Sequence, residues 1–229
     1  MFQGFTQKTS DFFWELAFNN ERSWFLEHKQ EFEDWVNSPF RALAQDTFAL
    51  MQQRYPQTEL KLHISRIYRD ARRLHGRGPY KDHLWFSIKK SDGLLDGPFF
   101  WFELGAADYR YGMGFFNAGS SQMAAFRSIV DANPARFERL IRKMEAHGEF
   151  HLIGEEYKRP KGNYGEPISR WYSRKQLGME CSRDFGGDIL TERLPQILTD
   201  GFAKLMPLYE FFLSFYREEE AESKAEGGR

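Results

Sequence analysis

The range Arg66–His83 has the composition and spacing of an anion-binding site. Residues 61–90 carry nine Lys or Arg against two acids, a net charge of +7 in a chain whose total is −1. An arginine guanidinium donates paired, coplanar hydrogen bonds that fit phosphate or carboxylate oxygens. Gly76 and Gly78 flank Arg77, and glycine lets backbone amides approach a ligand closely. The segment therefore predicts a pocket for a small phosphate- or carboxylate-type ligand.

An ordinary charged surface is the alternative for such a segment, because solvated charges and exposed ion pairs are common. Acidic residues directly follow Arg69 and Lys81 and can neutralise them. Arg66, however, has the same strand parity as Leu60 and Ile64, so unless a β-bulge intervenes we expect it to point inward. A buried guanidinium needs an acid or a bound anion, which favours the pocket.

Other side chains with catalytic or ligating chemistry give weaker signals. His75 and His83 flank the basic loop, and a histidine side chain can act as an acid–base group near neutral pH. His147 and His151 have a glycine between them, and no H-E-x-x-H or paired-cysteine motif occurs, so we expect no metal. Cys181 is more typical of packing than of catalysis. No nucleotide-binding or nucleophile-elbow motif occurs. We expect no cofactor, and no pattern specifies a reaction.

Helices are the first elements that position these side chains. Ser10 and Asn20 are N-cap candidates, because their side chains can accept hydrogen bonds from first-turn amides. Apolar residues recur at helical spacing over residues 24–36. Pro39 ends that helix and suits the first turn of the next, which continues to Tyr55.

The central part of the chain has the period-two alternation of half-buried strands. Apolar and polar residues alternate in 60–65 and again in 84–89. The turn cluster Ser91–Gly97 then leads to two ring-rich runs, Phe99–Phe102 and Tyr109–Phe116. Short gaps between strands predict hairpins and a mainly antiparallel sheet.

Helical periodicity returns in the second half of the chain. It predicts helices at Ser120–Asp131 and Pro134–His147, and a last one at Leu194–Arg217 that is divided by Pro207. Between residues 148 and 190 we expect short strands, loops and one small helix.

These elements predict one α+β domain over residues 1–217, with N-terminal helices, a central mainly antiparallel sheet and further helices packed on it. Residues 218–229 are charged and poor in apolar side chains, so we expect a disordered tail. One cysteine excludes an intrachain disulfide, and no signal peptide or apolar run of ~18 residues occurs. We expect a soluble, cytoplasmic protein without a membrane partner.

Several segments together resemble one known family. The segment RIYRD at residues 66–70, followed by PYK at 79–81 and His83, is similar to the hallmark of the domain-of-unknown-function 2461 family of conserved hypothetical proteins. Three more segments are similar to parts of that family: the helical N-terminus, the Gly-rich run Tyr111–Phe116 with Arg127, and the loop Lys158–Tyr164 with Lys175.

The resemblance implies no activity, but it suggests that three basic segments converge on one pocket. Gly112 and Gly114 would then keep the pocket floor low, since they remove side chains from a strand. The candidate ligand-binding residues are Arg66, Arg69, Arg73, Tyr80, Lys81, His83, Arg127, Arg159, Lys161 and Lys175.

Two other classes of function stay open. A nucleic-acid-binding protein would use Arg-rich loops with Tyr68, Tyr80 and Trp85 to contact phosphates and stack bases; the acidic total charge makes this less favoured than a small anion. A structural or partner-docking module would use its arginines in internal salt bridges. The sequence predicts no oligomeric state.

Overall fold

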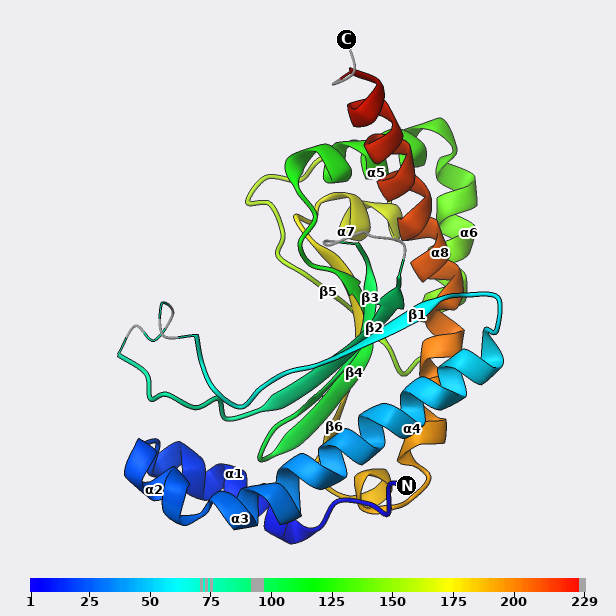
Figure 1. Cartoon of the computed structure of the whole chain (residues 1–229). Coiled ribbons are helices and arrows are strands. Elements are labelled where there is room, and N and C mark those ends of the chain that lie inside the picture. Colours follow the sequence, from blue (N-terminus) through cyan, green and yellow to red (C-terminus); the bar gives the residue numbers. More distant parts are fainter. Residues whose placement is uncertain (71, 73, 75, 92–96, 227–229) are drawn as a thin grey trace. The chain divides into compact units, whose positions relative to one another are not determined.

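The computed structural model describes the chain except residues 71, 73, 75, 92–96 and 227–229, and it leaves out the side chains of 215–226. The described residues form helices and a six-stranded antiparallel sheet of strand order β1-β2-β3-β4-β6-β5 (Figure 1). The predicted α+β class is confirmed. The strands are β1 (Leu60–Ile64), β2 (Leu84–Lys90), β3 (Phe99–Leu104), β4 (Asp108–Phe115), β5 (His151–Ile153) and β6 (Leu177–Asp184).

Two compact units make up the chain. The first unit comprises residues 1–90, 101–111 and 182–200, and the second comprises 91–100, 112–181 and 201–229. The single domain expected over residues 1–217 stays a prediction.

The first unit begins with short helices before one long one. These are α1 (Gln7–Phe18), α2 (Arg22–Glu27), α3 (Lys29–Phe32), the π-helical η1 (Glu33–Asn37) and α4 (Ser38–Arg54). Pro39 lies in the first turn of α4, as predicted, where its missing N–H costs no hydrogen bond.

Neither predicted N-cap residue caps a helix. Thr6 precedes α1, whereas Ser10 is buried inside that helix and its hydroxyl donates to the Ala106 carbonyl at 2.6 Å. Glu21 precedes α2, and the Asn20 side chain bonds instead to the backbone of Tyr80. Both predictions were wrong because the polar side chains satisfy distant backbone groups.

Strands β1 and β2 form the hairpin from which the basic segment extends. They pair antiparallel with Leu62 opposite Ile88. One face of the hairpin packs on α4, where the rings of Phe40 and Phe86 have centroids 5.9 Å apart; α4 runs along β1 in Figure 1. The period-two pattern places Trp85 on the opposite face from Phe86.

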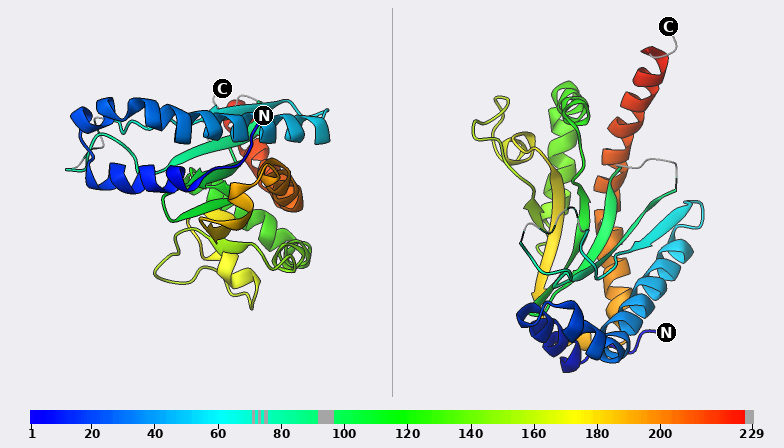
Figure 2. Two further views of the ribbon diagram at one scale, coloured as in Figure 1. Left: turned by 90° about the horizontal axis from the view of Figure 1, so that it is seen from below. Right: turned by 60° about the vertical axis from the view of Figure 1, so that its left-hand side comes forward.

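The second unit contains α5 (Ser120–Ala132), α6 (Pro134–Glu145), α7 (Ile168–Tyr172) and the residues of α8 (Leu194–Glu226) from Gly201 onward. Aromatic side chains pack between these helices: the ring centroid of Phe137 lies 5.4 Å from that of Phe126 and 5.2 Å from that of Phe211. Figure 2 shows α5 and α6 beside α8.

Pro207 does not divide the last helix, so that prediction was wrong. Helix α8 continues through it to Glu226 and thus enters the segment 218–229 for which we expected disorder. A proline inside a helix costs ~3 kcal/mol. Leu205 and Leu208 on either side are fully buried, and their burial offsets that cost.

Gly112 and Gly114 are packing residues of the second unit. A Cβ on Gly112 would lie 2.0 Å from the Met179 carbonyl oxygen, and one on Gly114 would lie 2.3 Å from the Phe116 ring. Protein atoms occupy the space that we expected to form a pocket floor. Glycine is required because neighbouring backbone and ring atoms approach the strand closely.

Candidate functional site

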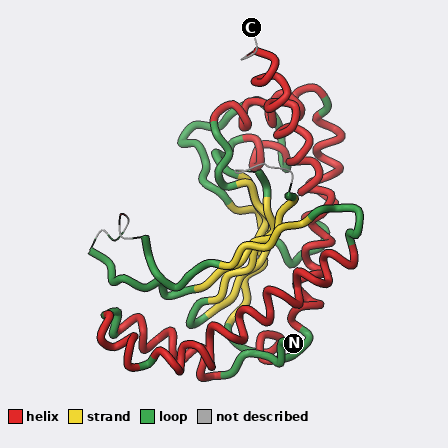
Figure 3. The backbone as a smooth tube through the Cα atoms, viewed as in Figure 1, coloured by secondary structure: helices red, strands yellow, loops and turns green. Residues whose placement is uncertain are grey.

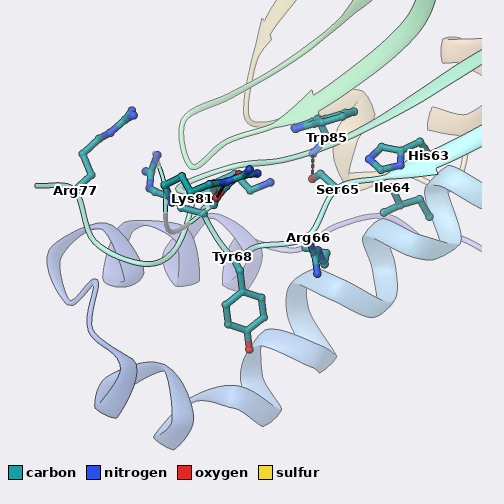
Figure 4. Close-up of a pocket in the computed structure, with 11 residues that line it drawn as sticks. His63, Ile64, Ser65, Arg66, Tyr68, Arg77, Lys81 and Trp85 are labelled. Carbon is teal, nitrogen blue, oxygen red and sulfur yellow. Dashed lines mark hydrogen bonds and ion pairs between the residues drawn. The ribbon is translucent and has the colours of Figure 1, made fainter. Parts of the chain in front are cut away.

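A hollow of about 710 Å³ lies in the first unit beside the basic segment (Figure 4). Its described lining combines basic side chains with the rings of His63, Tyr68 and Trp85. The charged residues of this lining are Arg66, Arg69, Arg72, Arg77, Lys81 and one carboxylate, Asp70.

The range Arg66–His83, called the basic segment here, has two arms that continue to pair in the connection between the end of β1 and the start of β2. Tyr68 and Tyr80 form an antiparallel bridge, the Arg69 amide donates to the Pro79 carbonyl, and the Lys81 amide donates to the Ile67 carbonyl, both at 2.8 Å. Figure 3 shows this segment extending as a long loop from the strands. The pairing brings Arg69 and Lys81, twelve positions apart in sequence, to one place.

Asn20 fixes the second arm of the segment to the N-terminal helices. Its side chain accepts from the Tyr80 amide at 2.9 Å and donates to the Tyr80 carbonyl at 3.0 Å, as a neighbouring strand would. The Tyr80 ring is 2% exposed and stacks on Phe25 with centroids 4.1 Å apart. A Cβ on Gly78 would lie 2.3 Å from the Asn20 side chain, which accounts for the glycine.

Arg69 is held in place by a backbone carbonyl and a carboxylate. Its Nε donates to the Tyr80 carbonyl at 2.7 Å, and its Nη2 lies 3.5 Å from Asp82 Oδ1. The side chain is only 15% exposed. A guanidinium fixed by one edge keeps its other edge oriented for a ligand.

Asp82 joins Arg69 to His83. The His83 Nδ1 lies 2.9 Å from Asp82 Oδ1. Partial burial raises the pKa of Asp82, but the hydrogen bond from His83 and the charges of His83 and Arg69 outweigh it, so the pKa is lowered overall. His83 is thus paired beside the hollow and is absent from its described lining.

Lys81 is partly buried among like charges. Burial lowers the pKa of its ammonium, Arg69 and Arg66 lower it further, and only Glu103 opposes them. Within the described part of the chain, no hydrogen bond or ion pair is made by this ammonium. A bound anion would relieve the repulsion.

Arg66 does not point into the core, and that prediction was wrong. Its side chain is exposed, whereas Ser65 and Ile67 are buried. The alternation of β1 stops at its end, Ile64, and resumes with the opposite phase, which turns Arg66 outward. The Ser65 Oγ accepts from the Trp85 amide at 2.9 Å at this point. Among described residues, Arg66 makes no ion pair or hydrogen bond, and it belongs to the lining of the hollow. In Figure 4 its side chain lies on the opposite side of the segment from Trp85.

The rest of the basic loop is partly described. Arg72 is exposed and forms a bidentate pair with Asp70, with Nη2 and Oδ2 2.7 Å apart. That hydrogen bond raises the pKa of Arg72. The candidates Arg73 and His75, and most of the predicted turn Ser91–Gly97, lie outside the described residues.

The remaining candidates lie in the second unit around the ring of Tyr157. Lys161, Arg127 and Lys175 place their cationic groups 4.9, 5.3 and 5.8 Å from its centroid. The Arg127 guanidinium donates to the carbonyls of Tyr172, Met123 and Arg174, and Lys175 pairs with Glu155. Arg159 is exposed.

In a second polar cluster of this unit, two tyrosine hydroxyls form hydrogen bonds with the same carboxylate. The hydroxyls of Tyr164 and Tyr172 donate to Asp131 at 2.6 and 2.9 Å. Burial and then the bond to Asp131 raise the pKa of Tyr172 to about 12. No spacing of residues in the sequence predicted this cluster.

The candidate residues therefore fall into two groups, one in each unit. Arg66, Arg69 and Lys81 come together in the first unit, and Arg127, Lys161 and Lys175 come together in the second. The convergence of both groups on a single pocket stays a prediction.

Two features of the described residues bear on other functions. No described helix is long and apolar enough to cross a membrane. The described part of the chain also contains no group of three His, Cys, Asp or Glu side chains that could hold a metal ion. Cys181 is 3% exposed and packs in the second unit.

The fold and the hollow define an α+β protein with a basic, ring-bordered surface on the extension of one hairpin. The sequence pattern of the conserved hypothetical proteins of DUF2461 matches residues 8–211, and the chain belongs to this family. No curated protein matches the chain.

Proposed function

We propose that the chain binds a small phosphate- or carboxylate-type anion in the hollow of the first unit. Arg69 and Lys81 hold the anion, and Arg66 adds a further positive charge to the lining. The observation that carries the proposal is the position of Lys81, a partly buried ammonium whose nearest charged neighbours include two guanidiniums and which has no ion-pair partner among the described residues.

The positive charges that surround Lys81 favour binding of an anion in the hollow. Like charges brought together during folding raise the free energy of the empty site, and an anion recovers that energy. The Asn20 and Tyr80 contacts keep Arg69 and Lys81 in place before a ligand arrives, so little ordering is needed on binding. The proposal assigns binding and no reaction.

Calorimetric titration with inorganic phosphate and with citrate tests the proposal. Arg66→Ala removes an exposed side chain that contributes nothing to the described packing, so the fold should be retained. Hydrogen bonds to charged groups contribute about 1.5–3 kcal/mol, so we expect an affinity at least about tenfold weaker. The matched control is Arg139→Ala, an exposed position on α6.

Lys81→Gln provides the second variant and should abolish binding while the unfolding temperature stays at or above that of the parent. Unchanged affinity in both variants would contradict the site. Absence of binding of either anion to the parent chain would contradict the proposal as a whole.

A further inference from the structure

We propose that the ligand of this hollow is a nucleotide, with its base on Trp85 and its phosphate on Arg69 and Lys81. The inference rests on the anion site proposed above and names the class of ligand that the site takes. It draws on the part of the hollow that the anion itself does not use.

The hollow has two chemically different ends (Figure 4). Arg77 and Lys81 lie at one end, and Trp85 and His63 lie at the other. A phosphate or carboxylate alone would fill only the basic end. The volume of about 710 Å³ falls within the ~300–1,000 Å³ typical of sites for drug-sized ligands.

The ring end is built on the face of the hairpin that does not pack on α4. Trp85 is partly buried, with its ring centroid 5.1 Å from that of His63, and the two planes are inclined by 41°. Part of the surface of both rings is therefore left outside the core of the unit. Within the described part of the chain, the indole N–H of Trp85 makes no hydrogen bond.

A partly exposed indole beside cationic groups matches the two parts of a nucleotide. Every nucleobase presents a flat π face, and stacking on an aromatic side chain is favourable whatever the base. Guanidinium and ammonium groups bind the phosphate. A mononucleotide and a nucleic-acid strand share this chemistry. We expect the mononucleotide because its size suits a hollow of about 710 Å³ and because the chain carries a net negative charge, which disfavours a long polyanion.

Calorimetric titration with adenosine 5′-monophosphate and with ribose 5-phosphate tests the base contact, since the two ligands share the phosphate and sugar and differ in the base. We expect the nucleotide to bind about tenfold more tightly or better. Trp85→Leu should remove that difference and leave the affinity for ribose 5-phosphate unchanged. Trp14→Leu, an exposed tryptophan on α1, is the control and should change neither affinity.

His63→Ala removes an exposed ring, so it provides a second test if Trp85→Leu fails to fold. It should lower the affinity for adenosine 5′-monophosphate and leave the affinity for ribose 5-phosphate unchanged. A short oligoadenylate that binds more tightly than the mononucleotide, with the same dependence on these rings, would assign the ligand to a nucleic-acid strand. Equal affinity for both phosphates in the parent chain would overturn the nucleotide inference and leave the anion site standing. Binding of neither would overturn both.

Discussion

At the scale of single residues, the site consists of cations that differ in how they are held. Arg69 is fixed by a backbone carbonyl and a carboxylate, Lys81 is crowded by like charges, and Arg66 is exposed. Residue types and spacing were enough to select all three. The sequence did not predict the direction of Arg66, because the end of β1 removes the alternation on which that expectation depended.

Lys81 should reduce the stability of the chain when no anion is bound. The pKa of Lys81 is below its ordinary value of 10.5 in the folded chain, so the folded state binds this proton less well than the unfolded state. The cost is present at neutral pH and disappears as pH rises toward 10.5.

We therefore expect Lys81→Met to increase the free energy of unfolding at neutral pH, by no more than about 1 kcal/mol since the side chain is only partly buried. Urea denaturation in phosphate-free buffer measures the change, and added phosphate should stabilise the parent chain but not the variant. A loss of stability in this variant would show that the ammonium is satisfied by protein groups.

Tyr172 should make the second unit sensitive to alkaline pH. Its pKa is raised from 10.0 to about 12 by burial and by the bond to Asp131. The contribution to stability is complete below pH 10.0 and is lost as pH rises through about 12. It amounts to at most about 3 kcal/mol.

Tyr172→Phe should flatten the decline in unfolding free energy over this alkaline range, at a cost near neutral pH of about 1–3 kcal/mol for the lost bond to a carboxylate. Denaturant unfolding across the range measures both effects. Tyr68→Phe, at a 55% exposed position, is the control. Identical alkaline profiles for parent and Tyr172→Phe would show that the raised pKa has no part in the decline.

At the scale of elements, the hairpin of β1 and β2 and its extension position the site. Period-two patterning predicted both strands, and short gaps between strands predicted a mainly antiparallel sheet, since alternation and spacing are local properties of the chain. The Asn20 contact with Tyr80 could not be predicted this way, because it joins residues 60 positions apart. The same holds for Ser10, whose hydroxyl bonds to a carbonyl 96 positions away.

Asn20→Ala should loosen the basic segment while the strands stay intact. Two partly buried hydrogen bonds to the Tyr80 backbone are lost, and we expect a decrease of about 1–3 kcal/mol in unfolding free energy. Amide hydrogen exchange at Tyr80 and Lys81 should accelerate, and phosphate affinity should fall. Asn19→Ala removes only a contact with Glu15 on an exposed helix end and should change none of these; an equal effect of both substitutions would argue against the Asn20 contact.

At the scale of the whole molecule, charge is segregated along the chain. Residues 61–90 sum to +7 and the remainder to −8, and in the folded first unit the excess of cations gathers around one hollow. Segregation of this kind attracts anionic ligands over distance. The division into two units was not predictable from pattern, because each unit is assembled from segments distant in sequence.

Crystals of the chain soaked in millimolar selenate test the central claim most directly, because the anomalous signal of selenium locates a phosphate-like anion without reference to any activity. We predict a peak within hydrogen-bonding distance of Arg69 and Lys81, and its loss in crystals of Lys81→Gln. Peaks confined to other surfaces, with the hollow beside Lys81 occupied by water alone, would contradict the anion site.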